Sequence, residues 1–265
     1  HAGLLPIRGH SNVQGMGSMA VIPALKTAVF NRLIEEGVTV PSMEGYDTMA
    51  CIQAAYNHEM DFAFCLGGNL YGSNPNSDLA AQAFSNIDTV VYLSTALNTG
   101  HAWGTGKETI ILPVMARDEE KQSTTQESMF SFVRLSDGGI TRHQNLRSEV
   151  EVIGEVARCV LGNDDLFHWG ELQNHNSIRN LIARIIPGFE SMANMGVTKK
   201  EFHIPGRILH DPAFPTASGK AKFIYHSIPN LKRLKENEFQ LISVRSEGQF
   251  NTVVYDNEDI YRGQE

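Results

Sequence analysis

Small and amide side chains follow two apolar runs in the middle of the chain. The first run, 62–66, ends in Gly67-Gly68-Asn69, and the second, 89–93, ends in Ser94-Thr95. Glycine lets a backbone come close to a ligand, while exposed amides and hydroxyls can bind an anion such as a phosphate. These residues therefore predict a site for a nucleotide-like group, although two ordinary turns after strands would carry the same residue types.

The elements around these residues predict a parallel sheet. The apolar runs at 62–66, 89–93 and 109–112 are expected to be strands, and the apolar spacing within 79–84 predicts a helix between the first two. Continuous apolar runs that alternate with helices are typical of a parallel sheet covered on both faces, which binds its ligand beyond the carboxyl ends of the strands. The predicted fold class is α/β, a Rossmann-like mostly parallel sheet flanked by helices, with partial flanking domains.

Other segments carry weaker patterns. Helices are predicted at 48–57, at 148–161 with Ser148 as its N-cap, and from Ser18 to Gly37. Strands are predicted at 129–135, before an Asp137-Gly138-Gly139 turn, and at 239–244. The charged segment 116–126 predicts an exposed loop, and His168 and His175 suggest a surface pair rather than a metal site.

Composition limits the classes of function. The chain has 265 residues, of which 42% are hydrophobic and 20% charged, so it can bury a sizeable core. A net charge of -8 argues against nucleic acid or an anionic membrane surface as the main partner. No apolar stretch approaches the roughly 20 residues that span a bilayer, and no export signal is visible. Cys51, Cys65 and Cys159 are irregularly spaced and predict buried free thiols rather than disulfides or a metal site, which favours a reducing compartment such as the cytoplasm.

A second nucleotide motif lies near the start of the chain. Residues 15–20 fit G-x-G-x-x-A, and Glu35 or Glu36 follows at the distance expected for binding a ribose. The motif works only where a buried strand leads directly into the first glycine, and here the polar segment 8–14 intervenes. A nicotinamide-dependent dehydrogenase that uses Gly15 to Ala20 is therefore the alternative prediction.

Several segments, taken in order, resemble one family, the molybdopterin-dependent oxidoreductases and in particular formate-dehydrogenase-like alpha subunits. Their order and spacing over nearly the whole chain carry the resemblance. They are 8–15 (RGHSNVQG), 66–69 (LGGN), 110–113 (IILP), 126–130 (QESMF), 214–223 (FPTASGKAKF), 245–252 (RSEGQFNT) and 261–263 (YRG).

The resemblance implies a cofactor and a domain plan. The cofactor is molybdenum bis(molybdopterin guanine dinucleotide), in which each of two pterins carries a guanine nucleotide. The chain is then expected to be an internal fragment of a longer polypeptide. Four parts are implied: the tail of an upstream α/β cofactor-binding domain (1–47), an α/β domain that binds one guanine nucleotide (48–165), a helical or irregular connection (166–237), and the start of a truncated β-rich cap (238–265).

The resemblance also implies which residues contact the cofactor. In the α/β domain these are the strand-end residues together with Asn98, whose amide could reach the guanosine. The full set of implied cofactor-binding residues is Asn12, Gln14, Gly15, Gly67, Gly68, Asn69, Ser94, Thr95, Asn98, Gln126, Glu127, Arg245, Gln249 and Asn251.

Two departures from the family pattern limit the expected activity. Formate dehydrogenases carry an arginine directly after a Gly-Tyr pair, whereas Gly45-Tyr46 is followed here by Asp47, which would repel formate. The cysteine that ligates molybdenum and an iron–sulfur cluster belong upstream in the family, and no cysteine of this chain matches them. The fragment alone is expected to be inactive, while the whole protein would act on a small-molecule substrate and an electron acceptor, and could bind an electron-transfer subunit. A non-catalytic α/β interaction module remains a further alternative.

Overall fold

The computed structural model describes residues 12–162, 166–206, 213–228, 230 and 234–241, and the backbone of two short strands at 249–250 and 254–255. The chain divides into two units, His1–Pro205 and Gly206–Glu265. The predicted internal boundaries at residues 47, 165 and 237 stay predictions. Among the described residues, every helix is too short or too polar to span a bilayer.

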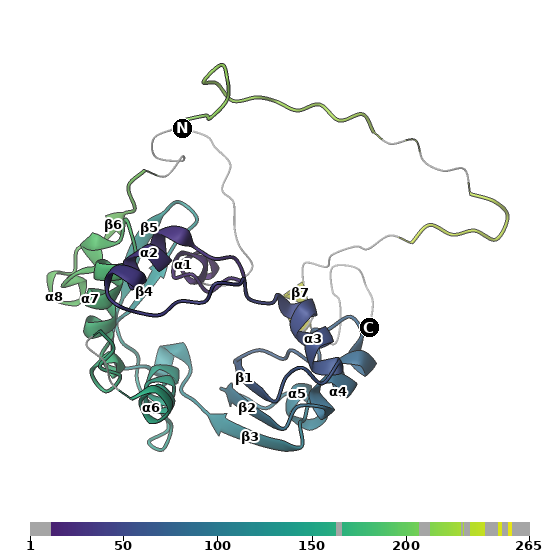
Figure 1. Cartoon of the computed structure of the whole chain (residues 1–265), viewed down its shortest axis with the longest axis horizontal. Helices are drawn as coiled ribbons and strands as arrows, with labels where there is room; N and C mark the ends of the chain where they lie inside the picture. Colours follow the sequence, from purple (N-terminus) through teal and green to yellow (C-terminus); the bar gives the residue numbers. More distant parts are fainter. Residues whose placement is uncertain are drawn as a thin grey trace. The chain divides into compact units, whose positions relative to one another are not determined.

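The first unit contains a three-stranded parallel sheet (Figure 1). Its strands are β1 (Phe62–Leu66), β2 (Thr89–Ser94) and β3 (Glu108–Pro113), in the order β1-β2-β3. The register pairs Phe64 with Val91 and Val91 with Ile110. The central strand β2 is apolar on both faces because both faces are covered, which confirms the predicted Rossmann-like α/β fold.

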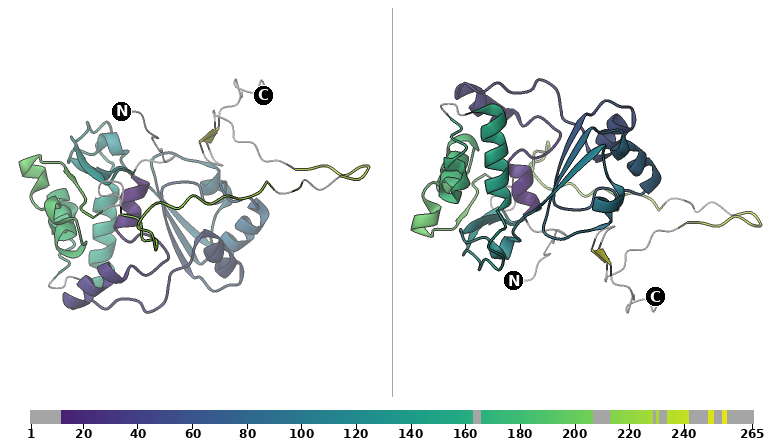
Figure 2. Two further views of the ribbon diagram at one scale, coloured as in Figure 1. Left: turned by 90° about the horizontal axis from the view of Figure 1, so that it is seen from above. Right: turned by 90° about the horizontal axis from the view of Figure 1, so that it is seen from below.

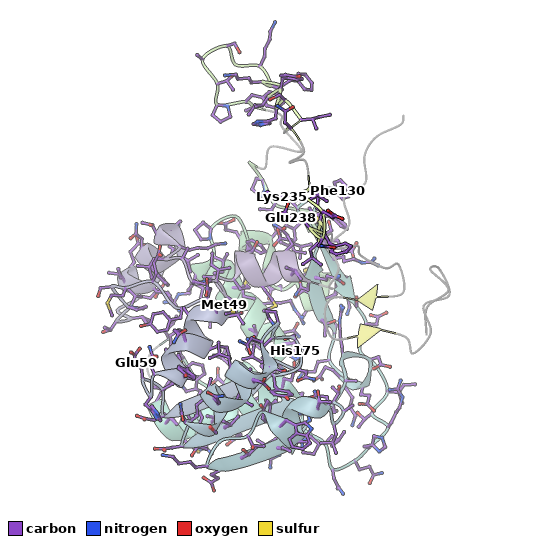
Figure 3. The ribbon with its side chains drawn as sticks, turned by 90° about the vertical axis from the view of Figure 1, so that its right-hand side faces the viewer. Met49, Glu59, Phe130, His175, Lys235 and Glu238 are labelled. Atoms are coloured by element: carbon purple, nitrogen blue, oxygen red, sulfur yellow. The ribbon has the colours of Figure 1, made fainter. Side chains whose placement is uncertain are left out.

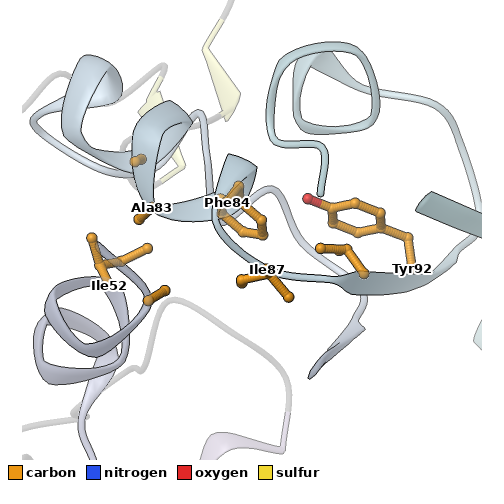
Figure 4. Close-up of a cluster of buried hydrophobic side chains, with 8 residues drawn as sticks. Ile52, Ala83, Phe84, Ile87 and Tyr92 are labelled. Atoms are coloured by element: carbon orange, nitrogen blue, oxygen red, sulfur yellow. The ribbon is translucent and has the colours of Figure 1, made fainter. Parts of the chain in front are cut away.

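Helices α3 (Thr48–Tyr56) and α4 (Ser77–Ser85) cover one face of the sheet. Their buried side chains, among them Ile52 and Phe84, pack with Ile87, Val90 and Tyr92 (Figure 4). The small residues Ala80 and Ala83 let α4 approach closely, since both are fully buried. The short helix α5 (Thr99–Trp103) follows β2.

Helix α6 (Glu149–Leu161) packs on the other face of the sheet, where Val152 contacts the cluster of Val91, Leu93 and Val114. Its ends agree with the sequence prediction. Ser148 accepts from the Glu151 amide at 3.1 Å and its own amide donates to the Glu151 carboxylate at 2.7 Å, forming a capping box. Gly162, with φ +70°, ends the helix.

A second, antiparallel sheet and its helices form another core in the same unit (Figure 2). The strands are β4 (Thr124–Glu127), β5 (Phe132–Ser136) and β6 (Phe202–His203), in that order. Around them lie the helical elements α1 (Val13–Ser18), α2 (Thr27–Glu35), η1 (Arg117–Glu119), η2 (Glu171–Gln173), α7 (His175–Ile185), η3 (Glu190–Met192) and α8 (Met195–Thr198). Val29, Val133 and Met195 share this core, so segments far apart in the sequence pack together.

The predicted helix from Ser18 is wrong in its start, because Ser18 ends α1 and α2 begins only at Thr27. Pro23 lies between the two helices; it has no amide hydrogen to donate within a helix, and its ring would clash with the preceding turn. The predicted loop 116–126 contains η1 and most of β4, whose side chains are half-buried against β5.

The strand predicted from 129 begins at Phe132 instead, after Ser131 adopts a left-handed conformation with φ +58°. The turn predicted at Asp137-Gly138-Gly139 is wrong, since 137–140 have no regular structure, and Gly138 and Gly139 instead allow a close approach. A Cβ on Gly138 would lie 1.7 Å from the Lys121 carbonyl oxygen, and one on Gly139 would lie 1.7 Å from that of Asp118. These glycines therefore let the segment after β5 lie directly against the loop before β4.

The second unit contains the two-stranded antiparallel pair β7 (Gln249–Phe250) and β8 (Val254–Tyr255). Residues 239–241 of the predicted strand at 239–244 have no regular structure, and 242–244 lie outside the described residues.

Asp47 has a local structural role, since its Oδ1 accepts from the Ala50 amide at 2.8 Å and caps α3. Asp47→Ala is expected to lower the free energy of unfolding by about 1 kcal/mol, because an amide of the first helical turn loses its partner. Asp47→Asn keeps a side-chain oxygen and serves as the matched control in urea denaturation. Equal stability of the alanine and asparagine variants would contradict the capping role.

Candidate functional site

The loops after β1 and β2 meet at the carboxyl end of the sheet. The Gly67 amide donates to the Leu93 carbonyl at 2.8 Å, so the first loop starts beside the end of β2. Gly67 and Gly68 have φ values of +65° and +69°, which L side chains rarely adopt, and no atom lies within 4 Å of a Cβ built on either one. The backbone of both glycines is therefore accessible to a ligand at this edge of the sheet.

Two asparagines join these loops. Asn98 Nδ2 donates to the Gly68 carbonyl at 3.0 Å, and Asn69 Nδ2 donates to Thr99 Oγ1 at 2.7 Å. Asn69 Oδ1 accepts from the Gly72 amide at 2.8 Å. A Cβ on Gly100 would lie 2.6 Å from Asn69 Oδ1, so the buried Asn69 amide fits only against a glycine there.

Ser94 and Thr95 lie at the same edge, directly after β2. Ser94 Oγ donates to the Ala96 carbonyl at 2.8 Å, and Thr95 is exposed. Five of the predicted site residues (Gly67, Gly68, Asn69, Ser94 and Asn98) are thus connected by hydrogen bonds or strand register at one edge, with Thr95 next to them.

A second group of predicted residues lies around α1 and β4. Asn12, itself left-handed with φ +58°, accepts from the Glu127 amide through Oδ1 at 3.0 Å. A Cβ on Gly15 would lie 2.2 Å from Asn12 Oδ1, so this glycine allows Asn12 to turn toward β4. Gln14 is half-buried on α1.

The neighbouring β4 residues of this second group are also held by protein contacts. Gln126 Oε1 accepts from Arg117 Nη2 at 3.3 Å, and Glu127 is buried. Of the predicted residues in the C-terminal segment, Arg245 and Asn251 lie outside the described residues. Gln249 belongs to β7 in the second unit, where only the backbone is described.

The alternative nicotinamide motif does not have the geometry that it needs. Gly15 and Gly17 lie inside α1, whereas the fingerprint glycines must form the turn between a strand and a helix. This finding removes the structural basis for a dehydrogenase that uses Gly15 to Ala20.

Sequence reasoning missed His101, which the structure connects to the strand-end loops. Its Nδ1 accepts from the Asn98 amide at 3.0 Å, its side chain is buried, and its ring packs at 86° on the ring of Tyr92 with 4.9 Å between centroids. His101 is the third residue after the N-cap Asn98, where Glu or Gln is the usual capping-box partner. The spacing of three residues between Asn98 and His101 was the signal in the sequence that could have identified this histidine.

The thiols near the site are not poised to react. Burial raises the pKa of Cys65 to about 11, so this side chain remains a thiol at neutral pH. Burial also raises the pKa of Tyr92 well above its usual value. Cys65 and Cys51 are half-buried and Cys159 is exposed, so the predicted burial is wrong for Cys159. No group of three or more His, Cys, Asp or Glu side chains within the described residues could hold a metal ion.

A shallow polar pocket of about 520 Å³ lies away from the predicted residues, beside the start of α7. It is lined by Gln122, Gly170, Glu171, Gln173, Asn174 and Ser177. His175, labelled in Figure 3, is next to the lining residue Asn174 in the chain. The Ser123 carbonyl oxygen lies 3.1 Å from His175 Nδ1 and 2.9 Å from Arg179 Nη1. The His175 side chain is mostly buried, so the predicted surface pair with His168 is wrong. These contacts join the loop before β4 to α7.

The chain is similar to curated proteins of two kinds. It is 31% identical over 99% of its length to an uncharacterized oxidoreductase of Mycobacterium tuberculosis, of which it covers 34%. It is 29% identical over 99% of its length to protein YdeP of Escherichia coli strain K12, of which it covers 36%. No family model matches the chain. The chain spans about a third of the length of the curated relatives it matches.

Proposed function

We propose that this chain is the part of a longer oxidoreductase that binds one guanine nucleotide of a molybdenum bis(molybdopterin guanine dinucleotide) cofactor. The observation that carries the proposal is the open backbone of Gly67 and Gly68 at the carboxyl edge of the parallel sheet, where ligands of such sheets bind. The word oxidoreductase in the name of the Mycobacterium relative and the ordered motifs from 8–15 to 261–263 support the same proposal.

The residues at this edge fit the nucleotide part of the cofactor. Gly67 and Gly68 leave room for a phosphate or ribose to approach the backbone, while Ser94 and Thr95 offer hydroxyls at the end of β2. The amides of Asn69 and Asn98 hold the loops in place. When bound, the molybdenum cofactor would supply the redox chemistry, and this chain would supply binding and orientation.

Formate is not proposed as the substrate. Asp47 lies where formate dehydrogenases, which the chain resembles, carry arginine. Its carboxylate instead caps α3. The molybdenum ligand, any iron–sulfur cluster and the surfaces for an electron acceptor or electron-transfer subunit would belong to the rest of the longer protein. The 265-residue chain alone is accordingly expected to show no dye-linked turnover.

Calorimetric measurement of GDP binding tests the proposal, because GDP represents the nucleotide part of the cofactor. Gly68→Val is expected to weaken GDP binding at least about tenfold, equivalent to roughly 1.4 kcal/mol, because the side chain would fill the open space at the edge. Gly37→Val is the matched control, since Gly37 is also left-handed (φ +83°) and also has no atom within 4 Å of its Cβ position. It should lose stability to a similar degree while it keeps GDP affinity.

Thr95 provides a test that does not depend on backbone strain. Thr95 is exposed, so Thr95→Glu and Thr95→Lys should fold equally well. A phosphate at this edge would make the glutamate variant bind GDP more weakly than the lysine variant. Failure of the wild-type chain to bind GDP, or equal affinity of all four variants, would reject the proposed function.

A further inference from the structure

Asn98 takes part in three hydrogen bonds at the strand-end loops, one of which joins the two loops. Its Nδ2 donates to the Gly68 carbonyl at 3.0 Å, its Oδ1 accepts from the Gly100 amide at 2.9 Å, and its own amide donates to His101 Nδ1 at 3.0 Å. The first bond crosses from the loop after β2 to the loop after β1. The position of the Gly68 backbone therefore depends on Asn98, whose position depends in turn on His101.

The bond between Asn98 and His101 fixes the form of the imidazole. A backbone amide can only donate, so Nδ1 must be an unprotonated acceptor, and the ring proton of the neutral side chain is on Nε2. His101 is only 9% exposed, and its Nε2 has no hydrogen-bond partner within the part of the chain that the structure describes. Its ring packs instead against Tyr92.

Protonation of His101 would place an N–H against the Asn98 N–H and remove this bond. No negative charge in the surroundings given by the structure would compensate the imidazolium. The titratable groups there are Tyr92 on β2, Cys65 on β1 and Tyr71, which belong to one hydrophobic cluster. Tyr71 is part of the loop after β1 and lies against Gly104, which follows α5. Burial raises the pKa of both Tyr92 and Cys65, so neither is negatively charged in the range from pH 5 to 8, and α5 has no other titratable side chain.

We propose that His101 is a positioning residue that makes nucleotide binding at this edge dependent on pH. In its neutral form it holds Asn98 and, through Asn98, the Gly68 backbone in the geometry that receives the nucleotide. Protonation releases Asn98, separates the two loops and weakens binding. This inference rests on the proposed function for the identity of the ligand, but the loop geometry can be tested without one.

The GDP affinity of the full chain between pH 5 and 8 provides the first test. His101→Gln keeps an acceptor for the Asn98 amide and does not titrate. Because both proteins bind the same ligand, any effect of GDP protonation cancels in the ratio of wild-type to variant affinity. This ratio is expected to fall about fivefold from pH 8 to pH 5, the loss that corresponds to one N-cap bond. His101→Ala, which has no acceptor, should bind weakly at every pH. A pH-independent ratio would overturn the inference and leave the proposed function intact.

Nuclear magnetic resonance of the wild-type chain without ligand gives the second test. The ¹⁵N shifts of His101 should report the Nε2-protonated tautomer at pH 8, and the Asn98 amide should lose protection from exchange as the pH falls to 5. An Nδ1-protonated ring, or protection that does not change with pH, would reject the inference. If GDP does not bind at any pH, the proposed function fails, but this measurement still decides the role of His101.

Discussion

Replacing Phe84 by alanine is expected to lower the free energy of unfolding by about 3–5 kcal/mol, the largest single effect that we foresee in the α/β core. Phe84 is 2% exposed on α4 and packs with Ile52, Ile87 and Tyr92 (Figure 4). Its ring lies 6.3 Å from that of Tyr92, centroid to centroid. The substitution would leave a cavity between α4 and the sheet, and urea denaturation followed by circular dichroism measures the loss.

Phe62→Ala is the matched control for this prediction. Phe62 is an aromatic residue on β1 but is 56% exposed, so the same substitution should cost under about 1 kcal/mol. Phe84→Leu fills most of the space and should fall between the two. Similar losses for Phe84→Ala and Phe62→Ala would contradict the core described above.

The second large effect is expected at Asn69, because its buried amide joins the two loops of the candidate site. Asn69→Ala removes the bond to Thr99 Oγ1 and leaves the Gly72 amide without its acceptor. A loss of about 2 kcal/mol of stability is expected from these groups. GDP affinity should fall as well, since the loop that carries Gly67 and Gly68 would lose one of its two links to the loop after β2.

A double-mutant cycle separates the contact from general destabilisation. Thr99→Val removes only the hydroxyl partner and Thr99→Ser retains it. The coupling free energy between Asn69→Ala and Thr99→Val is expected to be about 1 kcal/mol. A coupling near zero would show that the two side chains contribute independently, and the loop connection would then need another explanation.

The parallel sheet and its covering helices could be predicted because local patterns and tertiary packing agree there. The apolar run 62–66 coincides with β1, the run beginning at Thr89 gives β2, and Ser148 caps α6 as predicted. In β2 burial on both faces selects the apolar residues, and in α6 an apolar face and an N-cap do so.

Elements of the second sheet were harder to predict because their stability comes from distant partners. The segment Thr124–Glu127 is polar, yet it forms β4 since it pairs with β5 and its Glu127 amide donates to Asn12, far away in the sequence. The strand β6 has only two residues and exists through its pairing with β5. No local pattern contains this information.

The glycines of the candidate site could be predicted from the sequence, but the hydrogen bonds that hold its loops could not. Gly67 and Gly68 follow an apolar run, which is a signal visible in the sequence. The sequence does not show that the Asn69 and Asn98 amides are used between loops, because Thr99 and Gly68 are each 30 residues away from their partners. His101 was missed for a different reason: its partner Asn98 is only three residues away, but histidine is not the usual residue at that capping-box position.

The proposed function depends most on where a guanine nucleotide binds to the chain. Amide hydrogen exchange of the chain, with and without saturating GDP, tests this point directly. Protection is expected at 67–69 and 94–98, the two loops at the carboxyl edge of the sheet, with little change at Val13–Ser18. Protection confined to α1, or no protection at either strand-end loop, would contradict nucleotide binding at this edge of the sheet.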